Sequence, residues 1–117
     1  MATVAKQWYT GQTTLISFDL FDVNLEGDYR ISLYTVTNTT ANAGSLYHHV
    51  SWSDPISSEG LAGVTVPYTQ GYAENVVYAH CAAGSVIHVQ MFGTAPPAGS
   101  TFDLYAVVES IPNPIGF

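Results

Sequence analysis

The sequence is poor in charged residues, above all in cations. Only Lys6 and Arg30 are basic, and charged residues make up 9% of the 117 residues, against about 25% in an average soluble domain. Without clustered Lys and Arg, a chain cannot neutralise nucleic-acid phosphates or bind anionic lipid, so neither kind of partner is expected. A domain without a charged coat usually has much of its surface covered by other subunits.

Three further absences narrow the class of protein. A single cysteine, Cys81, cannot form an intrachain disulfide, so nothing points to an oxidising compartment. No apolar run is long enough for a membrane-spanning helix, although 47% of the residues are hydrophobic. The first residues, MATVAKQWYTG, lack the apolar region and cleavage site of a secretory signal. We therefore expect the chain to fold in a cytoplasm.

The residues that are abundant favour β-structure. Thr, Ser, Tyr and Val suit a pleated, half-buried surface. Apolar residues alternate with polar ones in successive short segments, for example Ile16, Phe18 and Leu20, and turn dipeptides separate these segments. The expected turns lie at Glu26-Gly27-Asp28, Asn42-Ala43-Gly44, Asp54-Pro55, Glu59-Gly60, Gln70-Gly71, Ala83-Gly84 and Ala95–Gly99.

Eight such segments fit within the chain if a first strand lies around Val4–Tyr9. The pattern predicts an all-β, eight-stranded antiparallel jelly-roll-like sandwich. An immunoglobulin-like sandwich is the alternative, weakened by the missing cysteine pair. The chain is expected to be a single domain over residues 1–117, with extended N-terminal (1–12) and C-terminal (111–117) arms.

Several predicted strands are apolar on both faces, namely Val76–Ala79, Val86–Val89 and Tyr105–Val108. A sandwich strand that faces water normally alternates cleanly between apolar and polar residues. These strands therefore predict that either a neighbouring subunit or an unusual local layer covers the outer faces. The alternative is that Val, Tyr and Ala are tolerated on an open surface.

Both ends of the chain carry candidate interface residues. Trp8 and Tyr9 lie near the start, and rings of this kind are enriched at interfaces. Ile115 and Phe117 lie in a tail that Pro112 and Pro114 keep extended. The tail is predicted to place its apolar residues on a neighbouring subunit, or alternatively to fold back on its own domain.

No metal site or cofactor is predicted. His48 and His49 are adjacent on one strand and point to opposite faces, while His48, His80 and His88 could converge only if three strands were neighbours. The acids Asp19, Asp22, Glu26 and Asp28 lie close together in the sequence but do not follow the EF-hand order.

No catalytic residues are predicted either, and we expect the protein not to be an enzyme. Ser, His and Asp are present, but the G-x-S-x-G motif is not. Cys81 lies in an apolar stretch, where a thiol keeps a high pKa. The tryptophans Trp8 and Trp52 and the eight tyrosines leave a carbohydrate-binding module open as an alternative function.

Three segments resemble a known group of proteins: Tyr29–Tyr34, Leu46–Trp52 and Thr101–Glu109. They are similar to small all-β structural domains of tailed-phage virions, including capsid cement or decoration proteins and tail-fibre modules. The resemblance implies a jelly-roll subunit, a homotrimer, that bridges copies of the major capsid protein in a virion assembled in the host cytoplasm. The alternative is a carbohydrate- or receptor-binding module of a tail fibre or surface protein.

Overall fold

The computed structural model describes residues 2–38, 44–67, 71–96 and 98–112, with residues 61–67 described by their backbone alone. Within these ranges no helix is long and apolar enough to cross a membrane. The structure is built from β-strands, which are β1 (Ala2–Gln12), β2 (Ser17–Asp22), β3 (Gly27–Asn38), β4 (Ser45–Ser53), β5 (Ser58–Pro67), β6 (Tyr72–Cys81), β7 (Val86–Gly93) and β8 (Thr101–Ile111).

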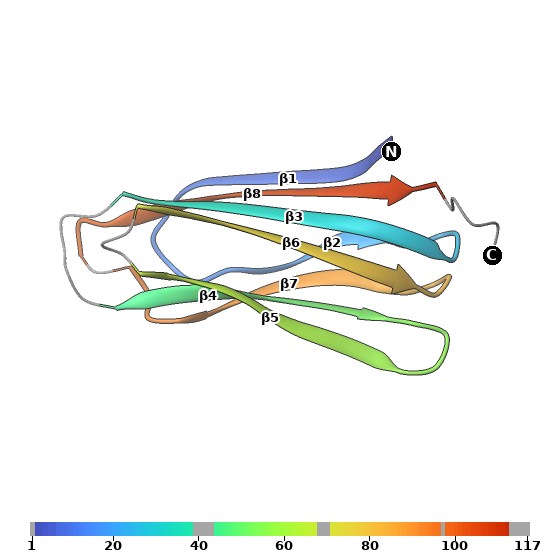
Figure 1. Cartoon of the computed structure of the whole chain (residues 1–117). Helices are drawn as coiled ribbons and strands as arrows, with labels where there is room; N and C mark the ends of the chain where they lie inside the picture. Colours follow the sequence, from blue (N-terminus) through green and yellow to red (C-terminus); the bar gives the residue numbers. More distant parts are fainter. Residues whose placement is uncertain (1, 39–43, 68–70, 97, 113–117) are drawn as a thin grey trace.

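The strands form two antiparallel sheets that pack face to face (Figure 1). One sheet has the order β1-β8-β3-β6 and the other the order β2-β7-β4-β5. Strands β4 and β5 are neighbours within one sheet, whereas every other consecutive pair of these strands is divided between the two sheets. This arrangement is a jelly roll, so the predicted fold class is confirmed over the immunoglobulin-like alternative.

The first and last strands of the chain pair with each other. Residues 2–12, which the sequence suggested as an arm with a short strand, form β1, and Ala2 pairs with Ser110 of β8. Strand β8 ends at Ile111, within the predicted C-terminal arm. Residues 113–117 of that arm lie outside the described ranges.

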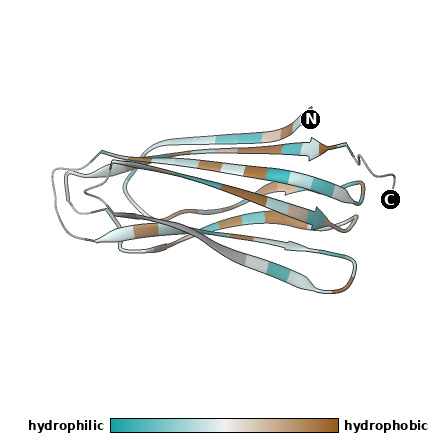
Figure 2. Ribbon diagram, in the orientation of Figure 1, coloured by the Kyte–Doolittle hydropathy of each residue, from teal (hydrophilic) through white to brown (hydrophobic). Residues whose placement is uncertain are grey.

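The core lies between the sheets and follows from the two-residue period of the strands. Every second residue of β3, β7 and β8 is buried, and hydrophobic bands alternate with polar ones along the ribbons (Figure 2). The fully buried apolar side chains with the largest volumes are Phe102, Ile31, Leu33, Leu46, Ile87, Leu104, Val23, Val50 and Val89. Cys81 also belongs to this core, and burial raises the pKa of its thiol to about 11, as the sequence predicts.

One polar pair crosses the core. The Nε2 atom of His48 on β4 is hydrogen-bonded to the hydroxyl of Thr35 on β3, so the bond joins the two sheets. Both residues are 0% exposed. The Nδ1 atom of His48 has no hydrogen-bond partner among the described residues. Burial lowers the pKa of this histidine from 6.5 to about 4, because the charged form is poorly solvated in the core.

One predicted turn is misplaced. Glu59 and Gly60 lie within strand β5 rather than at a turn. The turn comes earlier, where the Asp54 carboxylate accepts hydrogen bonds from the backbone N–H groups of Ile56 and Ser57, both at 2.8 Å. These bonds lower the pKa of Asp54 and close the loop on the aspartate itself. The Glu-Gly pair is therefore not needed as a turn.

Candidate functional site

A row of aromatic rings crosses the outer face of the β1-β8-β3-β6 sheet. The strand register places Trp8 of β1 opposite Tyr105 of β8, and Tyr105 opposite Tyr34 of β3. Tyr72 of β6 lies two residues from Glu74, the register partner of Tyr34, so its ring falls on the same face. We call Trp8, Tyr105, Tyr34 and Tyr72 the aromatic row.

The rings of the aromatic row are in contact from one edge of the sheet to the other. Trp8 meets Tyr105 edge to face with 6.0 Å between ring centroids. Tyr105 and Tyr34 are 6.3 Å apart, and Tyr34 stacks on Tyr72 at 6.2 Å. Aromatic pairs at such separations stabilise each other. The four strands thus present one continuous aromatic strip.

This strip faces solvent in the isolated chain. Trp8 is 64% exposed and Tyr72 59% exposed. The same face carries Tyr78, which is 67% exposed, and the half-exposed Val76. Monomeric proteins rarely leave apolar residues of this size together on one surface, so the face has the character of a binding surface.

Both cations of the chain lie on this face. Lys6 places its Nζ atom 5.7 Å from the centroid of the Trp8 ring, within range of a cation–π interaction. The Arg30 guanidinium contacts the Glu109 carboxylate, with 2.5 Å between Nη2 and Oε1. Each cation is therefore held by a neighbour at the face. A single ligand or partner seated there would meet the rings together with these two charges.

The predicted interface residues fall in different places. Trp8 belongs to the aromatic row, whereas the neighbouring Tyr9 points to the opposite face, packs against the core and lies 4.7 Å from the Phe18 ring. Ile115 and Phe117 lie outside the described residues. The sequence pattern does not reveal Tyr34, Tyr72 and Tyr105 as members of one strip, because only the strand register aligns them.

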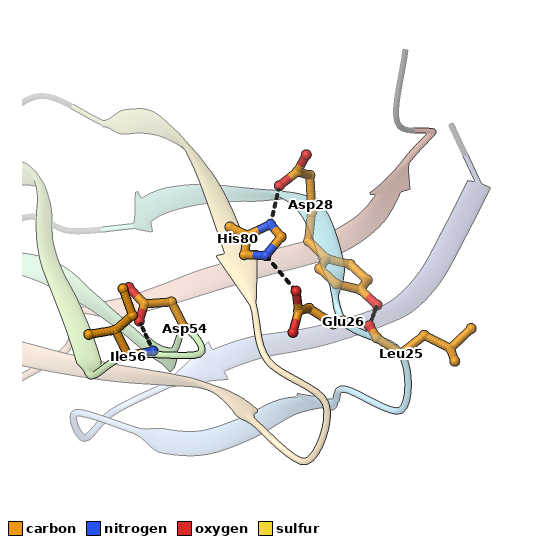
Figure 3. A network of polar contacts seen from close by, with 7 residues as sticks. Leu25, Glu26, Asp28, Asp54, Ile56 and His80 are labelled. Carbon is orange, nitrogen blue, oxygen red and sulfur yellow. Dashed lines mark hydrogen bonds and ion pairs between the residues drawn. The ribbon is translucent and has the colours of Figure 1, made fainter. Parts of the chain in front are cut away.

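The histidines are dispersed over the molecule. His48 is in the core, His80 is on the outer face of β6, and His88 is on the outer face of β7. His80 bridges two carboxylates, at 2.7 Å from Asp28 and 3.2 Å from Glu26 (Figure 3). Two hydrogen bonds raise the pKa of His80, and the bond to Asp28 contributes more than the bond to Glu26.

The acids grouped in the sequence are divided in the structure. Asp28 and Glu26 contact His80, whereas Asp19 contacts His88 on the other sheet. Within the described ranges, no group of three or more His, Cys, Asp and Glu side chains is arranged to hold a metal ion. The aromatic row is thus the feature that stands out as a candidate functional site.

No protein-family model and no curated protein match this sequence. Solved structures of similar fold do. The globular domain of zebrafish complement 1qA protein is 7% identical, with a TM-score of 0.59, over 97% of this chain and 99% of that chain. A chain in the capsid structure of Helicobacter pylori bacteriophage KHP30 is 12% identical, with a TM-score of 0.56, over 97% and 90%.

A third similar structure is the CBM22-1 xylan-binding domain of Paenibacillus barcinonensis Xyn10C. It is 17% identical, with a TM-score of 0.53, over 92% of this chain and 73% of that chain. At these identities the likenesses establish a shared fold. The fold is thus one that complement, phage-capsid and xylan-binding domains all use, and the surface must distinguish among such functions.

Proposed function

We propose that this chain is a structural subunit of a virion, a cement or decoration protein that binds the major capsid protein and stabilises the capsid lattice. The observation that carries the proposal is the aromatic row on an open sheet face, in a chain with two cations. Likeness to a chain of a phage capsid supports it at the level of the fold. No catalytic or cofactor role is part of this proposal.

The size of the face suggests how it is used. Four strands about 4.8 Å apart, each about ten residues long at 3.3 Å per residue, present roughly 600 Å². A stable interface needs about 800 Å² per partner. The face is of the order of that area, and we propose that it acts together with the chain ends in a homotrimer bound to the capsid. Ile115 and Phe117 are the proposed contacts of the C-terminal end.

Measuring how variants of the aromatic row bind capsids tests this proposal. The double variant Trp8→Ser/Tyr72→Ser is expected to bind capsids assembled without this chain about 100-fold more weakly, because two exposed aromatic anchors together contribute about 3 kcal/mol. Co-sedimentation measures the affinity, and light scattering after size exclusion measures the oligomer. The double variant should remain folded, because neither side chain belongs to the core.

Tyr47→Ser is the matched control, since Tyr47 stacks on Phe92 on the outer face of the other sheet. It should leave capsid binding unchanged. Equal losses in the control and the double variant would show that the row is not the contact surface. A wild-type chain that is monomeric and ignores capsids would contradict the proposal itself.

A carbohydrate-binding module is the second candidate function. It is favoured by the same row, because planar rings in line can stack against sugar rings, and by the fold shared with a xylan-binding domain. If this function is correct, the wild-type protein will bind xylan or an arrayed glycan in calorimetry. The variant Trp8→Ser will lose most of the heat of binding. Absence of binding across a broad glycan array would remove this candidate.

A further inference from the structure

Three side chains on the outer face of the β2-β7-β4-β5 sheet form a connected hydrogen-bonded array. The Oγ atom of Ser17 on β2 lies 2.8 Å from Nε2 of His88 on β7. The other ring nitrogen of His88, Nδ1, lies 2.8 Å from Oδ1 of Asp19 on β2. A hydroxyl, an imidazole and a carboxylate are thus joined in the order that activates a serine nucleophile.

The strand register explains why these residues meet. Met91 N donates to Ile16 O at 3.0 Å, which makes that pair a hydrogen-bonded one. Because such pairs alternate along antiparallel strands, Asp19 and His88 form a non-hydrogen-bonded pair, whose side chains are closest. Ser17 lies two residues from Asp19 on the same face and reaches the far side of the imidazole.

The same alternation places backbone donors beside the array. The N–H groups of Ser17 and Asp19 point away from β7, towards the edge at which β2 has no neighbouring strand. Donors of this kind can stabilise the negative charge that develops on a carbonyl oxygen under attack. The array therefore combines a nucleophile, a base and a carboxylate with donors at an open edge.

We infer that Ser17 is a reactive nucleophile that takes up acyl groups from small, unhindered esters. Nδ1–H of His88 donates to the Asp19 carboxylate, which leaves Nε2 as the acceptor for the Ser17 hydroxyl proton. Asp19 is a positioning residue that fixes this tautomer. This reactivity is independent of the virion role, because it lies on the opposite sheet from the aromatic row.

The reaction balances with water as the second substrate. Ser17 Oγ attacks the ester carbonyl carbon while its proton passes to His88 Nε2, and the C–O bond to the alcohol breaks. The departing alkoxide takes the proton and leaves as the alcohol, with the acyl group on Ser17. Water then gives a proton to His88 and its oxygen attacks the acyl carbon. Ser17 regains the proton as the carboxylic acid leaves.

Exposure determines which substrates and which rates to expect. The Asp19 side chain is 70% exposed and that of His88 33% exposed, so a small ester reaches Ser17 directly. Hydrogen bonds to a developing charge are weaker in water than in a closed site. Turnover will therefore be slow, and covalent labelling is the more sensitive measurement.

The first experiment treats the full chain with diisopropyl fluorophosphate and, separately, with p-nitrophenyl acetate. Wild type should acquire one phosphoryl adduct on Ser17 by peptide mass spectrometry. Ser17→Ala should lose it, and His88→Gln should label about 100-fold more slowly, as expected for loss of a general base. Ser32→Ala, on the outer face of the other sheet, is the matched control and should label like wild type.

The role of Asp19 is tested by rescue. Asp19→Asn should slow labelling about tenfold, because the His88 imidazole is then no longer held in the tautomer whose Nε2 accepts the Ser17 proton. Asp19→Glu should restore part of the rate. If the array only holds the β2 edge in register, these variants will lower the unfolding temperature and no adduct will form on wild type. That outcome overturns the proposal.

A second variant separates activation from folding. The thiol introduced by Ser17→Cys should react with iodoacetamide faster than an ordinary exposed thiol and slow down when His88→Gln is added. Native Cys81 will not interfere, since it is 0% exposed. Equal alkylation rates with and without His88, in folded protein, would also refute the inferred activation.

Discussion

Wild-type protein is expected to lose about 3 kcal/mol of unfolding free energy between pH 6.5 and pH 4 because of His48 alone. In the unfolded chain this histidine takes up a proton near pH 6.5, whereas in the core it does so only at about pH 4. Within that window the unfolded state binds more protons, so stability rises with pH and falls on acidification. The two pKa values correspond to about 3 kcal/mol.

The double variant Thr35→Val/His48→Leu isolates this effect. It removes both partners of the buried bond and replaces them by apolar groups of similar size, so its stability at pH 7 should be near or above that of wild type. Urea unfolding of both proteins at several pH values between 4 and 7 gives the difference. We expect the acid loss of wild type to exceed that of the variant by about 3 kcal/mol.

Other groups change both proteins alike and cancel in this comparison. His80 acts in the opposite direction, because its pKa is raised by Asp28 and Glu26 and its contribution is lost as pH rises. It is solvent-exposed, so screening reduces its effect.

The single variant Thr35→Val should be less stable at pH 7 by about 2 kcal/mol, since it leaves the imidazole unpartnered. Parallel curves of unfolding free energy against pH for wild type and the double variant would contradict the account of His48.

Gly93→Ala is expected to destabilise the domain by about 4 kcal/mol. Gly93 ends β7 with φ of +107°, where a side chain costs about 2 kcal/mol of backbone strain. A Cβ there would also lie 2.5 Å from the Ser45 carbonyl oxygen and 3.1 Å from the Leu46 Cα. Displacing packed backbone adds about 2 kcal/mol. The same Ser45 oxygen accepts the Thr94 N–H bond at 2.8 Å, so the shift would disturb the β4–β7 pairing.

Gly84→Ala is the matched control. Gly84 also has a positive φ, of +85°, but a Cβ there would meet nothing within 4 Å. This variant should show the strain alone, about 2 kcal/mol. Urea unfolding followed by circular dichroism measures both. Equal destabilisation of the two variants would show that contact with Ser45 contributes nothing.

Local pattern was sufficient to predict the fold class. A strand exposes alternate residues to opposite faces, so a sequence such as Phe102, Leu104, Ala106 and Val108 already specifies which face is buried. The Glu59-Gly60 turn was predicted wrongly because its residue types permit a turn without requiring one. Asp54 closes the loop earlier with its own carboxylate, which removes the need for it.

The surface sites depend on information that local pattern does not contain. The rings of Trp8 and Tyr105 are 97 positions apart in the chain, and only the β1–β8 register brings them together. The same is true of Ser17 and His88, which are 71 positions apart in the chain and are joined by the β2–β7 register. A shift of one residue in either pairing would send these side chains to the opposite face.

The sequence by itself determined an all-β sandwich with few charges, because alternation and composition act residue by residue. It also determined that Cys81 is a buried, poorly acidic thiol. Only the tertiary structure decided that one outer face carries a continuous aromatic row and the other a Ser17–His88–Asp19 array. The physical reason is that both depend on the pairing of strands distant in sequence, which the packing of the whole core selects.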